Sequence, residues 1–206
     1  MSEPDFASPL HHRTDRQSPR DLAIGLAEIT DLGMIDLRGE PGDDRFLAAI
    51  RDCLGVDLPR LPRSSARHEA VTVLWLSTDQ WLVLAPRADT PALVQALQVK
   101  LAGLHALVCD VSDMRCIIRL SGPEARMVLM KGCSLNLLAP EIKAGFVKRA
   151  LFAEIAALIH VVDDDPDVID LFVFRSYAEF AWEWLLRTGA RNALVELYGE
   201  QNSPPV

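Results

Sequence analysis

The densest group of possible metal ligands in the sequence is the run Asp163-Asp-Asp-Pro-Asp167. Carboxylate oxygens bind hard cations such as Mg²⁺ and Ca²⁺. The run lacks the ligand spacing and the glycine of an EF-hand, and Pro166 marks a turn, where exposed carboxylates are common. We therefore interpret the run as a solvated turn and predict no bound metal, with a cation site as the alternative.

The histidines give no convincing metal or catalytic group. Two of the five lie in a polar N-terminal stretch and two in apolar runs, where a hydrogen-bonded imidazole is commoner than a ligand. None has a cysteine at metal-ligand spacing. The five are His11, His12, His68, His105 and His160.

The cysteines do not suggest disulfides. Cys53, Cys109, Cys116 and Cys133 form no C-x-x-C pair, and a chain of 206 residues needs no disulfide staples. Cys109 and Cys116 flank one predicted hairpin turn and could face each other as a redox pair. We interpret them instead as small core residues with reduced thiols, as expected of a cytoplasmic protein.

No motif for binding a phosphate or activating a nucleophile occurs in the sequence. Gly122 precedes a predicted helix, and the N-terminus of a helix can bind an anion, but Glu124 would repel it. We interpret this stretch as a helix cap. The sequence thus predicts no catalytic, cofactor-binding or metal-binding residue.

Charge limits the possible partners. The net charge is −8, which disfavours binding to nucleic acid or to an anionic membrane surface. No apolar run is long enough to span a bilayer, and residues 1–5 do not resemble a secretory signal.

One predicted loop is basic although the chain as a whole is acidic. Such a loop suits an acidic partner or substrate, but it is also typical of an ordinary solvated loop. Its basic residues are Arg60, Arg63, Arg67 and His68.

The pattern of elements predicts an α+β fold with mostly antiparallel sheets and helices packed on one face. Hairpins are broken by single helices, without a regular βαβ alternation. The predicted strands are 22–29, 34–37, 70–76, 81–85, 106–111 and 116–120, and the predicted helices 43–54 and 90–102.

Two further helices are predicted from capping boxes, Ser121 with Glu124 and Ser176 with Glu179. The first would end at Gly132. The second would end at Gly189 and present one apolar face, made of Tyr177, Phe180, Ala181, Trp184 and Leu185. The stretch 148–162 is ambiguous, since its apolar spacing favours a helix in the first half and its valines favour strands.

The organisation along the chain predicts a single domain over residues 21–198, and a division into two similar halves near residue 105 is left open. Residues 1–20 and 199–206 are polar and proline-rich, so we expect a flexible arm and a tail. A long loop is expected over residues 57–67.

Several short motifs in the second half follow one another in a familiar order. They are the tryptophan-flanked hairpin 75–84, then 109–115, 119–126, 131–137, 170–176 and 182–185. Over about residues 66–190 this series resembles the gamma subunit of heterotetrameric sarcosine oxidase. The resemblance implies the fold of the folate-binding aminomethyltransferase domain of the glycine cleavage system, in which 148–162 would be strands.

The resemblance also implies a function and partners. The complex oxidises sarcosine to glycine, with FAD, FMN, NAD, tetrahydrofolate and zinc held by the alpha, beta and delta subunits and none by the gamma subunit. A subunit of a related N-methyl amino acid dehydrogenase is an alternative. A folate-binding protein is another, because folate-binding iron–sulfur assembly proteins of this superfamily carry a Lys-Gly-Cys motif like Lys131-Gly-Cys133.

The two predicted loose stretches suggest how such a subunit would bind. We expect the arm and the loop 57–68 to become ordered against a larger subunit, because neither shows apolar periodicity. Arginines favour docking on an acidic face. Those in the two stretches are Arg13, Arg16, Arg20, Arg60, Arg63 and Arg67.

Overall fold

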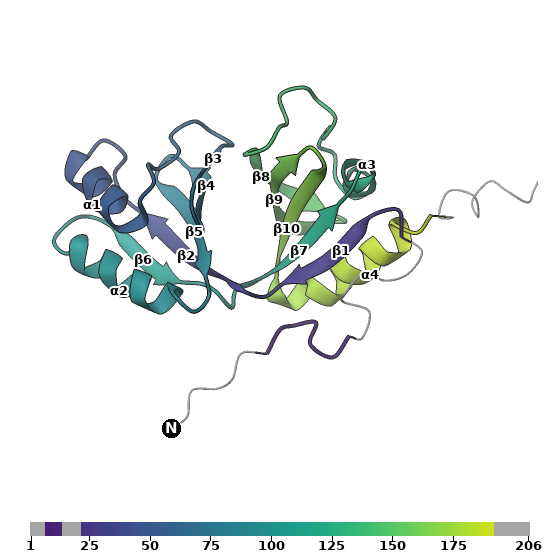
Figure 1. Ribbon diagram of the computed structural model, residues 1–206, viewed down its shortest axis with the longest axis horizontal. Coiled ribbons are helices and arrows are strands. Elements are labelled where there is room, and N and C mark those ends of the chain that lie inside the picture. The colour runs from purple at the N-terminus through teal and green to yellow at the C-terminus, as the bar shows by residue number, and fades with distance from the viewer. Residues whose placement is uncertain (1–6, 14–21, 192–206) are drawn as a thin grey trace, which may run out of the picture.

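The computed structural model describes residues 7–13 and 22–191. It contains two five-stranded antiparallel sheets whose inner faces are turned toward each other, with helices on the outer faces (Figure 1). This confirms the predicted α+β class with helices on one face of each sheet. No described helix has the length and apolar character that crossing a membrane requires.

The first half of the molecule is built from one continuous stretch of chain. In sequence order its elements are β2 (Leu32–Arg38), α1 (Asp44–Leu54), β3 (Ser65–His68), β4 (Val71–Ser77), β5 (Gln80–Pro86), α2 (Thr90–Lys100) and β6 (Leu107–Asp110). The sheet order is β3-β4-β5-β2-β6. Helices α1 and α2 cover the outer face of this sheet (Figure 1).

The second half repeats this order with one substitution. Its elements are β7 (Arg115–Ser121), α3 (Ala125–Met130), β8 (Val147–Phe152), β9 (Ile155–Asp164), β10 (Asp167–Phe174), the 3₁₀ turn η1 (Arg175–Tyr177) and α4 (Ala178–Thr188). The order β8-β9-β10-β7-β1 matches that of the first sheet, but β1 (Gly25–Ile29), from the start of the chain, takes the place of β6.

The boundary between the two halves along the chain therefore lies in the segment 111–114, between β6 and β7. The sequence alone left open a division slightly earlier, near residue 105. Both ends of the proposed 21–198 domain and the predicted tail 199–206 lie outside the described residues.

Three apolar clusters hold the layers together. One lies between the first sheet and its helices, with Phe46, Trp81 and Leu97 at its centre. Another lies between the second sheet and α3 and α4, around Phe152 and Trp182. The third fills the space between the two sheets and includes Met34, Leu74, Leu82, Val147, Leu158 and Phe172. The two halves thus share a core.

Several local predictions are confirmed with their physical cause. Helix α1 begins after Asp43, whose carboxylate accepts from the amide of Arg45, and ends at Gly55, which has a left-handed φ of 67°. The predicted hairpin is formed by β4 and β5. Helix α4 ends at the predicted Gly189, whereas α2 has Asp89 rather than Thr90 as its N-cap and ends at Lys100, two residues before the predicted end.

Neither predicted capping box forms. Ser121 is the last residue of β7 and α3 begins only at Ala125, while Ser176 lies inside η1 and α4 begins at Ala178. Tertiary pairing of β7 with β10 uses the backbone that the first box would have made helical. The buried face of α4 is accordingly Ala178, Ala181, Trp182 and Leu185, whereas the predicted Tyr177 and Phe180 are exposed.

The stretch 148–162 forms strands β8 and β9, so the resemblance was correct and the helical spacing was misleading. Residues 157–161 are all buried, because the strand lies between an inter-sheet core and a helix-covered core. A strand buried on both faces loses its polar–apolar alternation, and the remaining apolar spacing imitates a helix.

The two stretches expected to be loose also pack more closely than predicted. Leu10 is fully buried, so residues 7–13 are ordered against this chain itself, whereas residues 1–6 and 14–20 of the predicted arm lie outside the described residues. In the loop, Val56 and Leu58 are buried, and the indole N–H of Trp81 donates to the carbonyl of Pro59 at 2.9 Å. Alternate apolar residues anchor this loop, a periodicity that the sequence interpretation missed.

Candidate functional site

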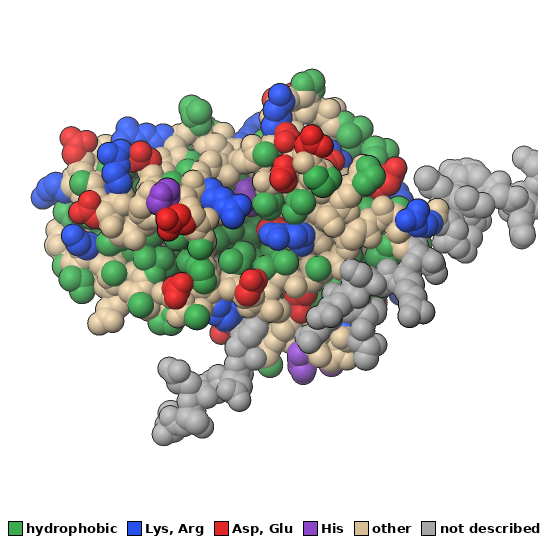
Figure 2. Space-filling model, in the orientation of Figure 1, with side chains coloured by type: hydrophobic (Ala, Val, Ile, Leu, Met, Phe, Trp, Pro, Cys, Tyr) green, Lys and Arg blue, Asp and Glu red, His purple; other side chains and the backbone are tan. Residues whose placement is uncertain are grey.

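A row of three polar residues crosses the inner face of the second sheet. Arg119 on β7, Asp170 on β10 and His160 on β9 are direct neighbours in the strand register. The Arg119 guanidinium donates two hydrogen bonds, of 2.7 and 2.8 Å, to Asp170, which is 1% exposed. Figure 2 shows basic side chains at the rim of a hollow between the two halves. Because both carboxylate oxygens of Asp170 accept from Arg119, the pair links β7 to β10 as part of the fold.

His160 joins this row to the other half. Its Nε2 lies 3.3 Å from the hydroxyl of Ser65 on β3, and its Nδ1 has no partner among the described residues. Burial lowers the pKa of His160 to about 4, so the ring is neutral near pH 7. This agrees with the predicted core histidine rather than with a titrating catalytic group.

Carboxylates of the acidic run 163–167 form hydrogen bonds and an ion pair within the chain. Asp163 accepts from the amides of Asp164 and Asp165, which closes the turn between β9 and β10. Asp167 pairs with the Arg126 guanidinium at 2.8 Å. Among the residues that the structure describes, no group of three or more His, Cys, Asp or Glu side chains is placed to hold a metal ion.

Arg126, in the 119–126 motif, has a structural role. Besides Asp167, it donates to the carbonyls of Leu137 at 2.6 Å and Ile142 at 2.7 Å, and its side chain is almost fully buried. It therefore fixes the long connection from α3 to β8 against the turn of β10. The two arginines of the 119–126 motif are thus structural, each holding a carboxylate of β10.

The predicted hairpin between Cys109 and Cys116 is wrong, and of the two cysteines interpreted as core residues only Cys116 is buried. The two residues flank a connection between different sheets, since β6 pairs with β2 and β7 pairs with β1 and β10. Cys109 is exposed, whereas Cys116 is buried and burial raises its thiol pKa. A hairpin cannot form, because each strand has a partner closer to its own core.

The Lys131-Gly-Cys133 triplet also has structural contacts. Lys131 donates to the carbonyl of Thr188 at the end of α4, and Gly132 packs so closely that a Cβ there would lie 2.7 Å from the ring of Phe152. Burial raises the pKa of the Cys133 thiol. A protonated thiol is a poor nucleophile or ligand.

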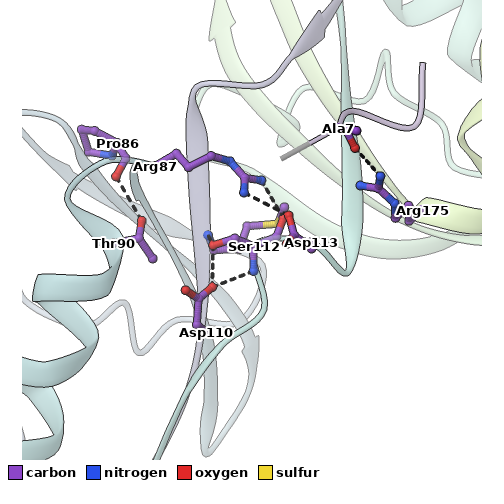
Figure 3. Close-up of polar contacts among 9 residues, drawn as sticks. Ala7, Pro86, Arg87, Thr90, Asp110, Ser112, Asp113 and Arg175 are labelled. Atoms are coloured by element: carbon purple, nitrogen blue, oxygen red, sulfur yellow. Dashed lines mark hydrogen bonds and ion pairs between the residues drawn. The ribbon is translucent and has the colours of Figure 1, made fainter. Parts of the chain in front are cut away.

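The segment joining the halves is fixed by a network shown in Figure 3. The Ser112 hydroxyl donates to Asp110 at 2.6 Å and accepts from the buried amide of Met34 at 3.0 Å. Arg87 donates to Asp113 at 3.0 Å and to the Ser112 carbonyl at 3.1 Å. This accounts for the 109–115 motif, whose polar residues shape the crossing from one sheet to the other.

The basic residues singled out in the sequence do not form one surface. Arg13 pairs with Glu183 at 3.1 Å and His12 with Glu179 at 3.0 Å, so both hold residues 7–13 on α4. His11 contacts the Ser8 carbonyl, Arg67 donates to the carbonyl of Glu69, and His68 and His105 are exposed. Arg16 and Arg20 lie outside the described residues.

Arg60 and Arg63 lie beside two different grooves. Arg60 borders one of about 610 Å³ between α1 and the loop, together with Asp44, Arg51, Asp57 and Leu61. Arg63 borders another of about 540 Å³ at the seam between the halves, where β4 and β8 meet. Sequence reasoning missed Lys148 and Arg149 in the second groove, because it did not treat residue 148 onward as an edge strand.

Comparison with known proteins identifies the family to which the sequence is similar. The family model described as "Sarcosine oxidase, gamma subunit family" matches residues 38–191. The sarcosine oxidase subunit gamma of Arthrobacter sp. is 32% identical over 152 residues, which cover 72% of each chain. That of Corynebacterium sp. strain U-96 is 34% identical over 137 residues, covering 66% of this chain and 64% of the relative.

Solved structures of related proteins have the same fold. A chain of the heterotetrameric sarcosine oxidase of Corynebacterium sp. U-96, in complex with pyrrole 2-carboxylate, superposes with a TM-score of 0.80 and 26% identity, covering 91% of this chain and 96% of that one. The glycine cleavage system aminomethyltransferase T of Bartonella henselae shares the fold, with a TM-score of 0.58 at 18% identity over 86% of this chain and 48% of that one.

Proposed function

The chain belongs to the sarcosine oxidase gamma subunit family, and from this we propose that it is the gamma subunit of a heterotetrameric sarcosine oxidase, which oxidatively demethylates sarcosine to glycine. The observation that carries the proposal is the sequence match to gamma subunits together with the structural match to a chain of a heterotetrameric sarcosine oxidase, 96% of which is covered.

Within that enzyme the chain has a structural and assembly role without catalysis of its own. Its most buried ionisable groups support this. Asp170 and Asp167 are each neutralised by an arginine, and burial raises the thiol pKa of Cys116 and Cys133. The two carboxylates are thus held by hydrogen bonds within the fold, and a thiol that stays protonated is a poor nucleophile.

The cofactors belong to the partners in this proposal. Alpha, beta and delta subunits hold FAD, FMN, NAD, tetrahydrofolate and zinc, and the complex is cytoplasmic, which suits four free cysteines. The aminomethyltransferase fold raises the question of folate binding here. The space between the sheets is occupied by apolar side chains such as Met34, Leu74 and Phe172, and Asp170 is already paired. We therefore assign tetrahydrofolate to a partner subunit.

Affinity purification of the tagged chain from its native cell tests this. We expect it to bring down three other subunits and sarcosine oxidase activity, while the chain expressed alone shows no flavin absorbance and binds no tetrahydrofolate. A stoichiometric flavin band in the isolated chain would contradict the non-catalytic role. Tight tetrahydrofolate binding by the isolated chain would favour the folate-binding alternative instead.

A further inference from the structure

The groove at the seam between the halves has an unusual charge for this molecule. We call it the basic seam groove; it is bordered by Arg63, Lys148 and Arg149, with Trp75, Ser77 and Thr78 beside them. Its lining holds three cations and no carboxylate, on a chain whose net charge is −8. Such a local excess of positive charge attracts an acidic group and repels the basic stretches of this same chain.

The three cations of the groove have no acidic partner among the described residues. None forms an ion pair with any residue that the structure describes. Arg149 donates one hydrogen bond, of 2.8 Å, to the Leu76 carbonyl, which orients its guanidinium across the seam. Arg63 is exposed and its own carbonyl accepts from the Val147 amide. Each cation therefore keeps donors for a carboxylate from outside.

Strand β8, which supplies two of these cations, is the edge strand of the second sheet, and residues 63 and 64 of the other half contact this edge only at its start. The amide of Val147 points away from β9, since it donates to Arg63. In an antiparallel pair the outward-pointing residues alternate, so the backbone N–H and C=O groups of Arg149 and Leu151 also point outward. Among the described residues no strand pairs with them. The Leu151 side chain is 64% exposed beside this edge.

We propose that an extended, acidic segment of a partner subunit docks here, adding a strand to the outer edge of β8 and placing its carboxylates on Arg63, Lys148 and Arg149. An open edge supplies backbone hydrogen bonds to any extended chain, and the cations select one rich in Asp and Glu. Leu151 gives an apolar contact at the end of the added strand. This inference rests on the proposed function, because it names where and how the complex is held.

Charge reversal at Arg63 and Lys148 tests the electrostatic half. The double variant Arg63→Glu with Lys148→Glu should bind the partner subunits at least ten-fold more weakly at low salt, and the difference should shrink as salt rises. The matched control is Arg60→Glu with Lys143→Glu, which makes the same change of charge at two exposed cations outside the groove and should bind as the parent does. Both chains should keep the parental melting temperature.

Leu151→Pro tests the strand addition. Proline removes one outward N–H without removing a bond to β9, so β8 should persist while binding weakens. In the assembled complex of the unaltered chain, the amides of Arg149 and Leu151 should become protected from hydrogen exchange.

A photo-crosslinking amino acid at position 151 identifies the occupant. The expected product joins it to a partner peptide rich in Asp and Glu. A product with a neutral or basic peptide, or with residues 192–206 of this chain, which contain Glu196 and Glu200, overturns the proposal. If the double variant assembles as tightly as the parent, the docking site is wrong but the subunit role stands. If the unaltered chain brings down no partner, the proposed function itself fails.

Discussion

The guanidinium of Arg119 and the carboxylate of Asp170 form a two-fold hydrogen-bonded ion pair, at 2.7 and 2.8 Å, across neighbouring strands of the second sheet. The pair is asymmetric in exposure, since the side chain of Asp170 is 2% exposed and that of Arg119 is 33% exposed. Loss of the arginine therefore leaves a buried charge without a partner, while loss of the aspartate leaves a charge that water can reach.

We predict that Arg119→Met lowers the free energy of unfolding by about 3–5 kcal/mol, and that Asp170→Asn has a smaller effect. The double variant Arg119→Met with Asp170→Asn should be less destabilised than the sum of its two single changes, because no buried charge remains. Urea unfolding of the isolated chain gives all four values. Equal losses for the two single variants would contradict the asymmetry.

We predict that His160 makes stability fall in mildly acidic solution. Its pKa is about 4 in the folded chain against about 6.5 when unfolded, so the unfolded chain takes up the proton first. Stability is complete above pH 6.5 and is lost as the pH falls toward 4, by up to about 3 kcal/mol. Urea midpoints are measured between pH 7 and pH 4 for the parent and for His160→Gln. The difference between the two chains isolates the contribution of His160, because the carboxylates are the same in both.

The exposed His105 supplies the control for this measurement. His105→Gln should keep the full pH dependence of the parent chain, because this side chain is already exposed to water in the folded state. A His160→Gln chain that loses as much stability as the parent would show that the buried ring does not cause the effect.

We predict that Ser112→Ala lowers the free energy of unfolding by about 1–3 kcal/mol, although it removes only one oxygen atom. The change leaves the buried amide of Met34 without its acceptor and removes the contact to Asp110. Thermal unfolding measures it, with Ser77→Ala, whose hydroxyl makes an exposed contact to Asp79, as the comparison. Matching melting temperatures for the two variants would contradict the role given to the connector.

We predict that Cys109 alone reacts rapidly with a thiol reagent in the native chain. Cys109 is exposed, whereas burial raises the thiol pKa of Cys53, Cys116 and Cys133. Cys109→Ser should abolish the fast phase, and Cys116 should react only on unfolding. Survival of the fast phase in that variant would show that another thiol is accessible, and oxidation should yield no Cys109–Cys116 disulfide.

The sequence predicted those elements whose signals are local. Asp43 and Gly55 mark the two ends of α1, and the alternation of β4 and β5 around a polar turn marks a hairpin. These features depend on residues a few positions apart, where spacing alone carries the information. The order of the elements predicted the α+β class, and the family resemblance supplied the aminomethyltransferase fold and corrected the helical interpretation of 148–162.

What the sequence did not predict depends on contacts between distant residues. Arg119 and Asp170 are 51 positions apart, and nothing near either one shows that they pair. The basic seam groove unites Arg63 with Lys148 and Arg149 only because β3 and β8 meet at the seam. The false hairpin at Cys109 arose for the same reason, since β6 pairs with β2 rather than with its neighbour in sequence.

Strand β1 has a consequence for how this chain is made. It is made before the other described strands, yet its ladder partner among them is β7, and that sheet is finished by β10, near residue 174. At about 5–20 residues per second, β1 waits on the order of ten seconds before the rest of its sheet exists. All strands of the first sheet are made before β10, but the second sheet closes only when β1 meets β7 and β10. A ribosome that stalls before β10 therefore leaves β1 without its finished sheet, a state in which chaperones rather than the fold must protect the nascent chain.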